Sequence, residues 1–293
     1  MNKTNPRTLI VFPVVVLIGA FFAWVGSQGG YTFSGIPVFA LCIALAFIIQ
    51  WIAFIPAYIM QTEKFYDLMG SITYLSVAWL AVLLSPVMDG RSWLLVGIVS
   101  IWTVRLGVFL FRRISAAGED RRFRDIKPSF VRFLNAWTIQ GLWVSLTIAA
   151  ALAAITSGTR QSLGIIALIG FLLWLLGFGI EVIADQQKSN FRADPQNKGK
   201  FINTGLWSWS RHPNYFGEIV LWIGVAVIAI PVLSGWQWLT LISPIFVFFL
   251  LTRVSGVPML EKQADEKWGG QSDYEEYKAR TSTLILRPPS AAS

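Results

Sequence analysis

Residues 161–186 read QSLGIIALIGFLLWLLGFGIEVIADQ, and this stretch decides the fold class. Its first part, residues 161–180, contains no ionisable side chain. A helix needs about 20 mostly apolar residues to cross a hydrocarbon core roughly 30 Å thick. Lipid cannot hydrogen-bond to the backbone, so a span must be a helix or part of a closed barrel. Because the apolar run is continuous rather than alternating, it predicts a transmembrane helix.

The rest of the chain repeats this pattern. Of its 293 residues, 55% are hydrophobic and only 14% are charged, whereas soluble domains carry about 25% charged residues. We therefore expect an all-α, polytopic membrane bundle that forms a single domain over residues 1–293, with additional helices in 1–64. About eight spans are predicted, at residues 8–26, 37–60, 69–87, 92–113, 131–155, 161–186, 215–233 and 237–254.

The first apolar run has two interpretations. Lys3 and Arg7 precede it, as basic residues precede the core of a cleaved signal peptide. The run is about 19 residues long, which is longer than the usual signal core, and it contains Trp24. We favour a first helix that is retained in the protein.

The basic residues predict the orientation of the bundle. With eight spans, the loops on one side contain only Arg91 and Arg160, and the other basic residues fall on the opposite side. Lys and Arg accumulate in cytoplasmic loops, so both termini are predicted to be cytoplasmic, in the inner membrane if the protein is bacterial. Sidedness accounts for the net charge of +8 without nucleic acid as a partner.

Two residue types are too rare to build a metal centre. Cys42 is the only cysteine, and it lies in an apolar run. His212 is the only histidine. The sequence therefore predicts no internal disulfide and no cysteine-based or multi-histidine metal site.

Several polar side chains lie inside the apolar segments. A charge inside a span is unfavourable by several kcal/mol unless it faces protein or water. Residues near helix ends can instead extend to the membrane surface, but a shared polar pocket would satisfy all of them. They are Asp67, Arg105, Asn135, Gln140, Glu181, Asp185 and Glu218.

Two loops on the basic side offer sites for an anion. The segment 118–132 contains Arg121 and Arg122, which suit either anionic lipid head groups or the phosphates of a nucleotide. The segment 203–218 places Arg211 just before an expected helix start, which is a favourable place for an anion. Its aromatic residues suit stacking on a planar ring or an interfacial belt. Neither segment contains a soluble nucleotide-binding fingerprint.

The run Arg211-His212-Pro213-Asn214-Tyr215-Phe216-Gly217-Glu218-Ile219 resembles the Asn-x-x-Gly-Glu-Ile signature of the steroid 5-alpha-reductase-like membrane reductases. The resemblance extends over residues 65–285 and includes 135–141, 181–192 and the tail 273–280. It implies a pocket for NADPH that opens to the cytoplasm, and a lipophilic substrate that enters from the bilayer. Together with the charged loops described above, it gives the candidate cofactor-binding residues Arg105, Phe109, Arg121, Arg122, Asn135, Gln140, Glu181, Asp185, Arg192, Arg211, His212, Asn214, Tyr215 and Glu218.

The catalytic pair departs from the family pattern. The family's Glu and Tyr hold and protonate an enone carbonyl, and the matching positions here are Asp67 and Trp102. An indole N–H donates a hydrogen bond but does not release its proton. Tyr66, beside Asp67, is therefore the candidate acid. We expect hydride transfer to an activated double bond of a steroid-, sterol- or isoprenoid-like molecule.

Two other functions remain open. The Arg-His-Pro-x-Tyr-x-Gly pattern also resembles the isoprenylcysteine carboxyl methyltransferases, which bind S-adenosylmethionine, and Glu261, Tyr274 and Tyr277 resemble their tail. A transporter is the third possibility. Transporters usually contain internal repeats, and we find no repeat in this sequence.

Overall fold

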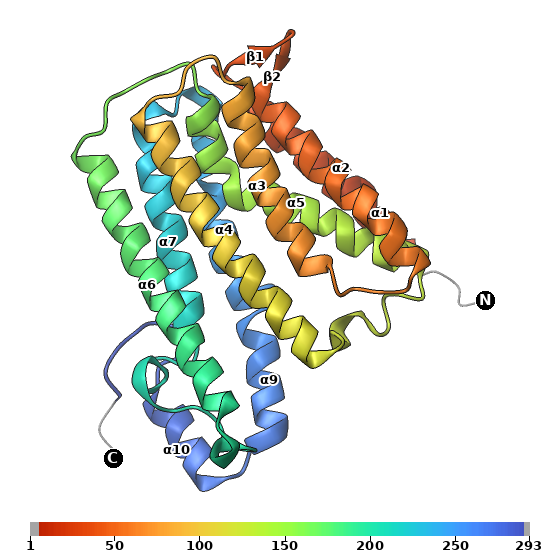
Figure 1. Ribbon diagram of the computed structural model, residues 1–293, viewed down its shortest axis with the longest axis vertical. Helices are drawn as coiled ribbons and strands as arrows, with labels where there is room; N and C mark the ends of the chain where they lie inside the picture. Colours follow the sequence, from red (N-terminus) through yellow and green to blue (C-terminus); the bar gives the residue numbers. More distant parts are fainter. Residues whose placement is uncertain (1–5, 290–293) are drawn as a thin grey trace. The chain divides into compact units, whose positions relative to one another are not determined.

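The computed structural model describes residues 6–289, with the side chains of residues 6, 7, 116, 117 and 121 excepted (Figure 1). Among these residues, eight helical segments are long and apolar enough to cross a membrane, which confirms the polytopic α-helical bundle. Seven are single helices: α1 Pro6–Gly26, α2 Val38–Ile59, α3 Tyr66–Leu84, α4 Gly90–Ala117, α5 Phe130–Thr156, α6 Ile165–Ala193 and α7 Pro213–Ala229.

The eighth apolar segment, Gly235–Trp268, is not one continuous α-helix. It contains a 3-10 turn Gly235–Leu241, helix α8 Ile242–Phe249, a π-turn Leu250–Val254 and helix α9 Val257–Trp268. The break falls at Gly256, where an added Cβ would lie 2.4 Å from the carbonyl oxygen of Leu251. The sequence predicted that this span ends at residue 254. The structure places a further helix after it, and α10 Ser272–Arg280 follows.

The described chain divides into two compact units. The first holds the chain up to Ala167 together with Ile228–Ser243, and the second holds Leu168–Val227 and the chain from Pro244 onward. The membrane sidedness and the retention of the first helix stay predictions.

Helix α5 forms the core of the first unit. It packs against α1, α2, α3 and α4, and 83% of its most apolar window is buried, compared with 22% for α1. The small residues of the segment 149–154 are buried almost completely, which lets neighbouring helices approach closely. Lipid-facing side chains therefore belong mainly to the helices around α5.

A short hairpin joins α1 to α2 in this unit. Strands β1 Thr32–Phe33 and β2 Ile36–Pro37 pair antiparallel around the turn Ser34–Gly35. Both turn residues have positive φ, 51° and 82°, which is the geometry of the two-residue hairpin turn that matches strand twist.

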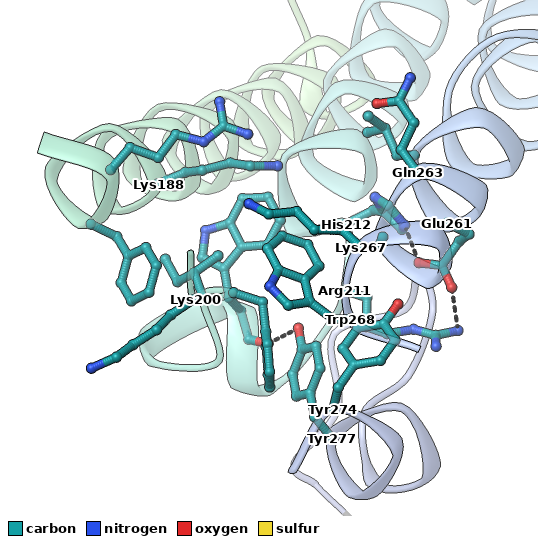
Figure 2. Close-up of a pocket in the computed structure, with 17 residues that line it drawn as sticks. Lys188, Lys200, Arg211, His212, Glu261, Gln263, Lys267, Trp268, Tyr274 and Tyr277 are labelled. Atoms are coloured by element: carbon teal, nitrogen blue, oxygen red, sulfur yellow. Dashed lines mark hydrogen bonds and ion pairs between the residues drawn. The ribbon is translucent and has the colours of Figure 1, made fainter. Parts of the chain in front are cut away.

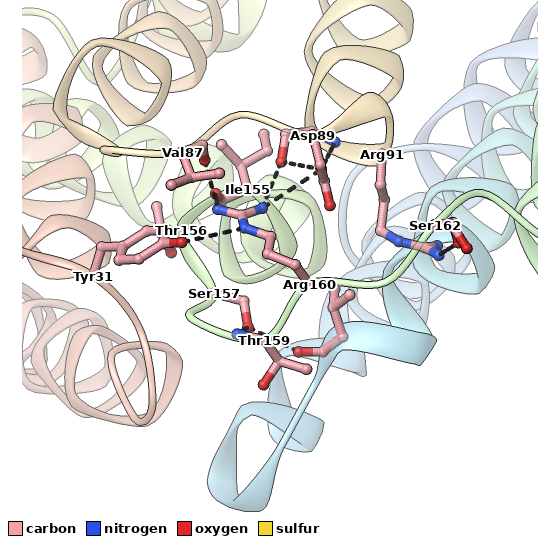
Figure 3. A network of polar contacts seen from close by, with 12 residues as sticks. Tyr31, Val87, Asp89, Arg91, Ile155, Thr156, Ser157, Thr159, Arg160 and Ser162 are labelled. Atoms are coloured by element: carbon pink, nitrogen blue, oxygen red, sulfur yellow. Dashed lines mark hydrogen bonds and ion pairs between the residues drawn. The ribbon is translucent and has the colours of Figure 1, made fainter.

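Arg160 connects several segments of the first unit (Figure 3). Its guanidinium donates to the carbonyl oxygens of Val87 at 2.9 Å and Ile155 at 3.0 Å. It also donates to the Ser92 hydroxyl at 2.7 Å and pairs with Asp89 at 3.6 Å. The single side chain thereby fixes the loop before α4, the start of α4 and the end of α5.

Arg91 has a similar role nearby. It is only 2% exposed. Its guanidinium donates to the carbonyl oxygen of Ser162 at 3.1 Å and to that of Ile228. Both arginines that the sequence placed on the side with few charges are thus used to hold backbone segments together.

In the second unit, glycines bring α6 and α7 into backbone contact. A Cβ added at Gly177 would lie 2.4 Å from the backbone nitrogen of Leu221, and one at Gly217 would lie 2.6 Å from the carbonyl oxygen of Gly177. A third glycine, Gly224, meets the backbone of Trp174 in the same way, at 2.5 Å. Small residues permit this close packing of membrane helices. The close packing also brings the polar side chains farther along α6 and α7 near one another.

Candidate functional site

A cavity of about 300 Å³ lies within the second unit (Figure 2). Its walls come from the end of α6, the loop 200–212, helix α9 and helix α10. Ligand sites are typically clefts of about 300–1,000 Å³, so the cavity can hold a small ligand or part of a larger one. It is lined by Lys188, Phe191, Arg192, Lys200, Phe201, Ile202, Trp207, Arg211, His212, Leu260, Glu261, Gln263, Ala264, Lys267, Trp268, Tyr274 and Tyr277.

Positive charge dominates this lining. Five of the described lining residues are lysines or arginines, and one, Glu261, is a carboxylate. Like charges around a hollow raise the local concentration of an oppositely charged ligand. The cavity therefore suits an anion with several charges. The five cationic residues are Lys188, Arg192, Lys200, Arg211 and Lys267.

Glu261 connects α9 to the loop that precedes α7. Its carboxylate contacts Nε2 of His212 at 2.8 Å and the guanidinium of Arg211 at 3.1 Å. Burial lowers the pKa of His212 below its ordinary value of 6.5, although the hydrogen bond to Glu261 opposes this shift. A neutral His212 that donates from Nε2 leaves Nδ1 as a hydrogen-bond acceptor.

Two tryptophans form fixed aromatic walls. The indole N–H of Trp207 donates to the carbonyl oxygen of Ala184 at 3.0 Å. That of Trp268 donates to the carbonyl oxygen of Gly199 at 2.6 Å. Each indole ring is therefore held in one orientation by a hydrogen bond.

The helix α10 adds further aromatic surface. The ring of Phe201 lies 5.2 Å from that of Tyr274 and 5.3 Å from that of Tyr277. The Tyr277 hydroxyl donates to the carbonyl oxygen of Trp207 at 2.7 Å. These contacts attach α10 to the loop on the other side of the cavity.

The chain after α10 holds the same loop from a second direction. The backbone N–H of Arg211 donates to the carbonyl oxygen of Ser282 at 2.8 Å, and its guanidinium donates to the Thr283 hydroxyl at 2.6 Å. The Ser210 hydroxyl donates to the carbonyl oxygen of Leu284 at 2.8 Å. Arg211 is thus positioned by Glu261 and by the tail together.

A polar pair lies between α6 and α7 in this unit. The side-chain amide of Asn214 donates to Asp185 at 3.1 Å. Asp185 and, one turn earlier, Glu181 are buried, at 6% and 3% exposure. Tyr215 stacks on His212 with ring centroids 5.6 Å apart, and Glu218 lies half-buried one turn along α7. Of the residues that the sequence predicted from 181 to 218, Arg192, Arg211 and His212 line the cavity. The others lie in the same unit but outside its lining; they are Glu181, Asp185, Asn214, Tyr215 and Glu218.

The proposed catalytic residues lie in the first unit. The Tyr66 hydroxyl donates to the carbonyl oxygen of Ala136 at 2.9 Å, and the Gln140 amide donates to the Tyr66 carbonyl oxygen at 3.0 Å. Asp67 pairs with Arg113 at 3.4 Å. The Tyr66 proton is engaged with backbone in this structure, and the Asp67 side chain is 22% exposed.

The remaining predicted residues of this unit occupy separate positions. Trp102 is buried edge-on against Tyr74, with ring centroids 5.3 Å apart. Arg105 lies over the ring of Phe109, at 5.3 Å.

Asn135 donates to the carbonyl oxygen of Thr8 at 2.7 Å and so attaches α1 to α5. Arg122 pairs with Asp120, with one contact of 2.8 Å. The side chain of Arg121 lies outside the described residues.

Sequence reasoning missed much of the cavity lining. Lys188, Lys200, Trp207, Lys267 and Trp268 were not among the predicted site residues. The available signal was the tail resemblance at 273–280, because a tail that matches a cofactor-binding family indicates that the helix before it also contributes to the site.

Comparison with known proteins places the chain in a family. It belongs to the family described as "Protein of unknown function (DUF1295)", whose model matches residues 53–281. No solved structure matches the chain significantly.

Three curated relatives match parts of the chain. An uncharacterized protein of Schizosaccharomyces pombe is 26% identical over 199 residues, 58% of this chain and 56% of that protein. The 3-oxo-5-alpha-steroid 4-dehydrogenase 1 of Macaca fascicularis is 32% identical over 118 residues, 40% of each chain. A probable O-methyltransferase of Ustilaginoidea virens is 34% identical over 58 residues, 20% of each chain.

These matches confirm the resemblance to the steroid 5-alpha-reductase-like proteins that the motifs predicted. The chain spans from a fifth to about half of the length of these three relatives.

Proposed function

We propose that this protein is a membrane-embedded, NADPH-dependent reductase that acts on a lipophilic, steroid-like substrate. The observation that carries the proposal is the cavity of the second unit, where five cationic side chains share the lining with one carboxylate. A dinucleotide with three phosphate groups suits such a lining, and guanidinium and ammonium groups are common phosphate ligands. The resemblance to the steroid dehydrogenases supports the reaction type.

The residues of the cavity fit such a cofactor. Among the described residues, two buried nitrogen atoms of the lining have no hydrogen-bond partner, Nδ1 of His212 and Nε of Arg211. The first is an acceptor suited to a ribose hydroxyl, and the second is a donor suited to a phosphate oxygen. Fixed indole and phenol rings nearby suit stacking on a nucleobase.

The proposal assigns separate roles to the other residues. Asp185, Asn214 and Glu218 would hold the nicotinamide half, and Arg192 and Arg211 would hold phosphate. When bound, NADPH supplies the hydride that is transferred to the activated double bond. Tyr66 or Asp67 would donate a proton or hydrogen bond to the substrate, which typically contributes about 10²–10⁴-fold to rate. Tyr66 would first have to exchange its hydrogen bond to Ala136.

Nucleotide binding by the purified chain tests this function. We expect NADPH to bind and S-adenosylmethionine not to bind in calorimetry of the protein in neutral detergent. The double variant Asn214→Ala/Glu218→Ala should lose NADPH affinity. Gln186→Ala is the matched control, because Gln186 is exposed on α6 and bonds only to Asn190 among the contacts described. Unchanged NADPH affinity in the double variant would remove these two residues from the site.

The alternative is a membrane methyltransferase. It is favoured by the match to a probable O-methyltransferase and by Glu261, which contacts both members of the Arg211–His212 pair. S-adenosylmethionine carries no phosphate and has two cationic groups, so the cationic lining argues against it. Binding of S-adenosylmethionine without binding of NADPH would decide for the methyltransferase.

We also propose that the cavity opens to the cytoplasm, since the basic loops are expected on that side. Reporter enzymes fused after the tail test this orientation. A cytoplasmically active reporter should function there, and a reporter that requires export should not. The reverse result would invert the proposed topology.

A further inference from the structure

Two lysines of the cavity share one arrangement. Nζ of Lys188 lies 4.2 Å from the ring centroid of Trp207, and Nζ of Lys267 lies 4.4 Å from that of Trp268. Cation–π contacts of this kind are attractive because the face of an aromatic ring carries negative charge. These contacts hold the lysine ammonium groups over the aromatic walls. The lysine side chains are thereby partly ordered before a ligand binds, which lowers the entropy cost of binding.

The two lysines enter the same cavity from different elements. Lys188 comes from the last turns of α6 and Lys267 from the end of α9, and Figure 2 shows both side chains directed into the hollow. An anion between them would interact with both walls. The pairing therefore depends on α9 being seated against the loop, as the Glu261 contacts keep it.

The carboxylate of the described lining is engaged with other residues. Glu261 is the one carboxylate among the described lining residues, and it is shared between His212 and Arg211. On the same helix, Asp265 accepts from Lys278 at 2.6 Å and from the Tyr274 hydroxyl at 2.9 Å. Among the described residues, no carboxylate forms an ion pair with Lys267, whose described contact is the Trp268 ring.

The surroundings indicate the chemistry of the ligand. An ammonium group is a compact charge with three donors, and a phosphate monoester presents about two negative charges and three terminal oxygens. Two ammonium groups can share such a group with little mutual repulsion. The adjacent indole walls are flat and rigid, which suits a nucleobase beside the phosphate better than the acyl chain of a lipid.

We propose that Lys188 and Lys267 form a subsite for the phosphate monoester of a nucleotide, the 2′-phosphate that distinguishes NADPH from NADH. This proposal rests on the proposed reductase function. It assigns cofactor selection to these two residues, whereas Arg192 and Arg211 act on the diphosphate that both cofactors contain.

The test compares phosphorylated and unphosphorylated nucleotides on the full chain in neutral detergent. Titration calorimetry would use NADPH, NADH, adenosine 2′,5′-bisphosphate and adenosine 5′-monophosphate as probes. In Lys188→Gln and Lys267→Gln we expect affinity for NADPH and the bisphosphate to fall about tenfold each, the effect of losing one charge-assisted hydrogen bond. Affinity for NADH and the monophosphate should change less than about twofold.

Two further variants make the result specific. Lys262→Gln is the matched control, since Lys262 lies on α9, pairs with Glu266 at 3.9 Å and does not line the cavity. It should leave all four affinities unchanged. Lys267→Arg keeps the charge and should retain the preference for NADPH, which separates loss of charge from misfolding.

Each outcome decides the question. Equal losses for NADPH and NADH, or no loss at all, would overturn the subsite while leaving the reductase proposal intact. A wild-type protein that binds both dinucleotides equally well would do the same. A wild-type protein that binds neither would overturn the proposed function and the subsite together.

Discussion

Two groups of arginine and lysine side chains in this protein differ in what surrounds them. In the first unit, the guanidinium of Arg160 contacts five acceptor groups of the protein, and the nearly inaccessible Arg91 donates to two backbone carbonyls (Figure 3). In the second unit, five cationic residues surround a hollow whose lining contains one carboxylate among the residues that the structure describes (Figure 2).

This difference separates two uses of positive charge. Cations that donate to several protein acceptors hold segments together, because removing one leaves those acceptors without their donor. Cations that line a cavity with few carboxylates raise its potential and favour anion binding. A variant should therefore change stability in the first group and ligand affinity in the second.

The largest effect is expected from Arg160→Met. This substitution leaves the carbonyl oxygen of Ile155 and the buried Ser92 hydroxyl without the Arg160 donor, and each unsatisfied buried group costs about 1–3 kcal/mol. We expect a loss of about 3 kcal/mol in stability, measured by thermal unfolding in detergent, with nucleotide affinity per folded molecule unchanged. Arg124→Met is the control, since Arg124 is 63% exposed in a surface ion pair and such pairs contribute about 0–1 kcal/mol. Equal unfolding temperatures for both variants would contradict the structural role.

A smaller effect is expected from Glu261→Gln, which should lower stability and raise affinity for NADPH. The variant loses charge-assisted hydrogen bonds to His212 and Arg211, so stability should fall by about 1–2 kcal/mol. Glutamine keeps a side-chain oxygen that can accept from Arg211 and hold α9 in place. Affinity for NADPH should therefore rise about fivefold, because the one repelling charge in the described lining is removed.

Asp89→Asn removes a carboxylate charge in the first unit and serves as the control for Glu261→Gln. Asp89 caps α4 by accepting from the backbone N–H of Ser92 at 2.8 Å, and it pairs with Arg160. Asparagine is an equally good cap, so we expect only a small loss of stability and no gain in affinity. A gain in affinity with Asp89→Asn would show that the two groups of charges are not separate.

Salt should distinguish the two groups without any substitution. Raising ionic strength from about 0.1 to 1 M shortens the screening length from about 10 to 3 Å. NADPH affinity should fall clearly, because the cavity attracts it by charge. The unfolding temperature should change little, because Arg91 and Arg160 bond mainly to neutral carbonyl and hydroxyl groups. Salt-independent NADPH binding would contradict the proposed role of the lysines and arginines.

The smallest effect concerns pH. Burial keeps the pKa of His212 below 6.5 in the folded protein, while Glu261 acts to raise it and Lys188 and Arg211 act to lower it. As pH falls below about 6.5, the unfolded chain takes up a proton before the folded chain does, so stability falls. Thermal unfolding without nucleotide should show this decrease between pH 7.5 and 5.5.

His212 is the only histidine in the chain, so the pH effect can be assigned directly. The variant His212→Asn should show a flatter profile over the same range. A profile as steep as that of the original protein would assign the titration to another group.

The spans were predictable from the sequence because lipid imposes length and apolarity on each helix. The eight apolar runs correspond to the eight membrane-length segments that the structure describes. Residues 203–218 also identified part of the site, since Arg211 and His212 do line the cavity.

The rest depended on packing that local sequence does not encode. Lys188 and Lys267 are far apart in the chain, and they line one cavity only because α9 folds back onto the loop 200–212. The restart of the helix at Val257, after the turn at Gly256, was hidden because 257–268 is too polar to resemble a span. The hydrogen bond from Tyr66 to Ala136 likewise depends on how α3 meets α5.

The tail that follows α10 has a consequence for biosynthesis. Residues 282–284 hold Ser210 and Arg211 through backbone and hydroxyl contacts, and α9 and α10 form one side of the cavity. The ribosome makes the chain from its N-terminus, so the basic loop emerges long before the segments that enclose it. The cavity is therefore completed after every membrane-length segment has been synthesised, and nascent chains that already contain the bundle still lack a place for the nucleotide.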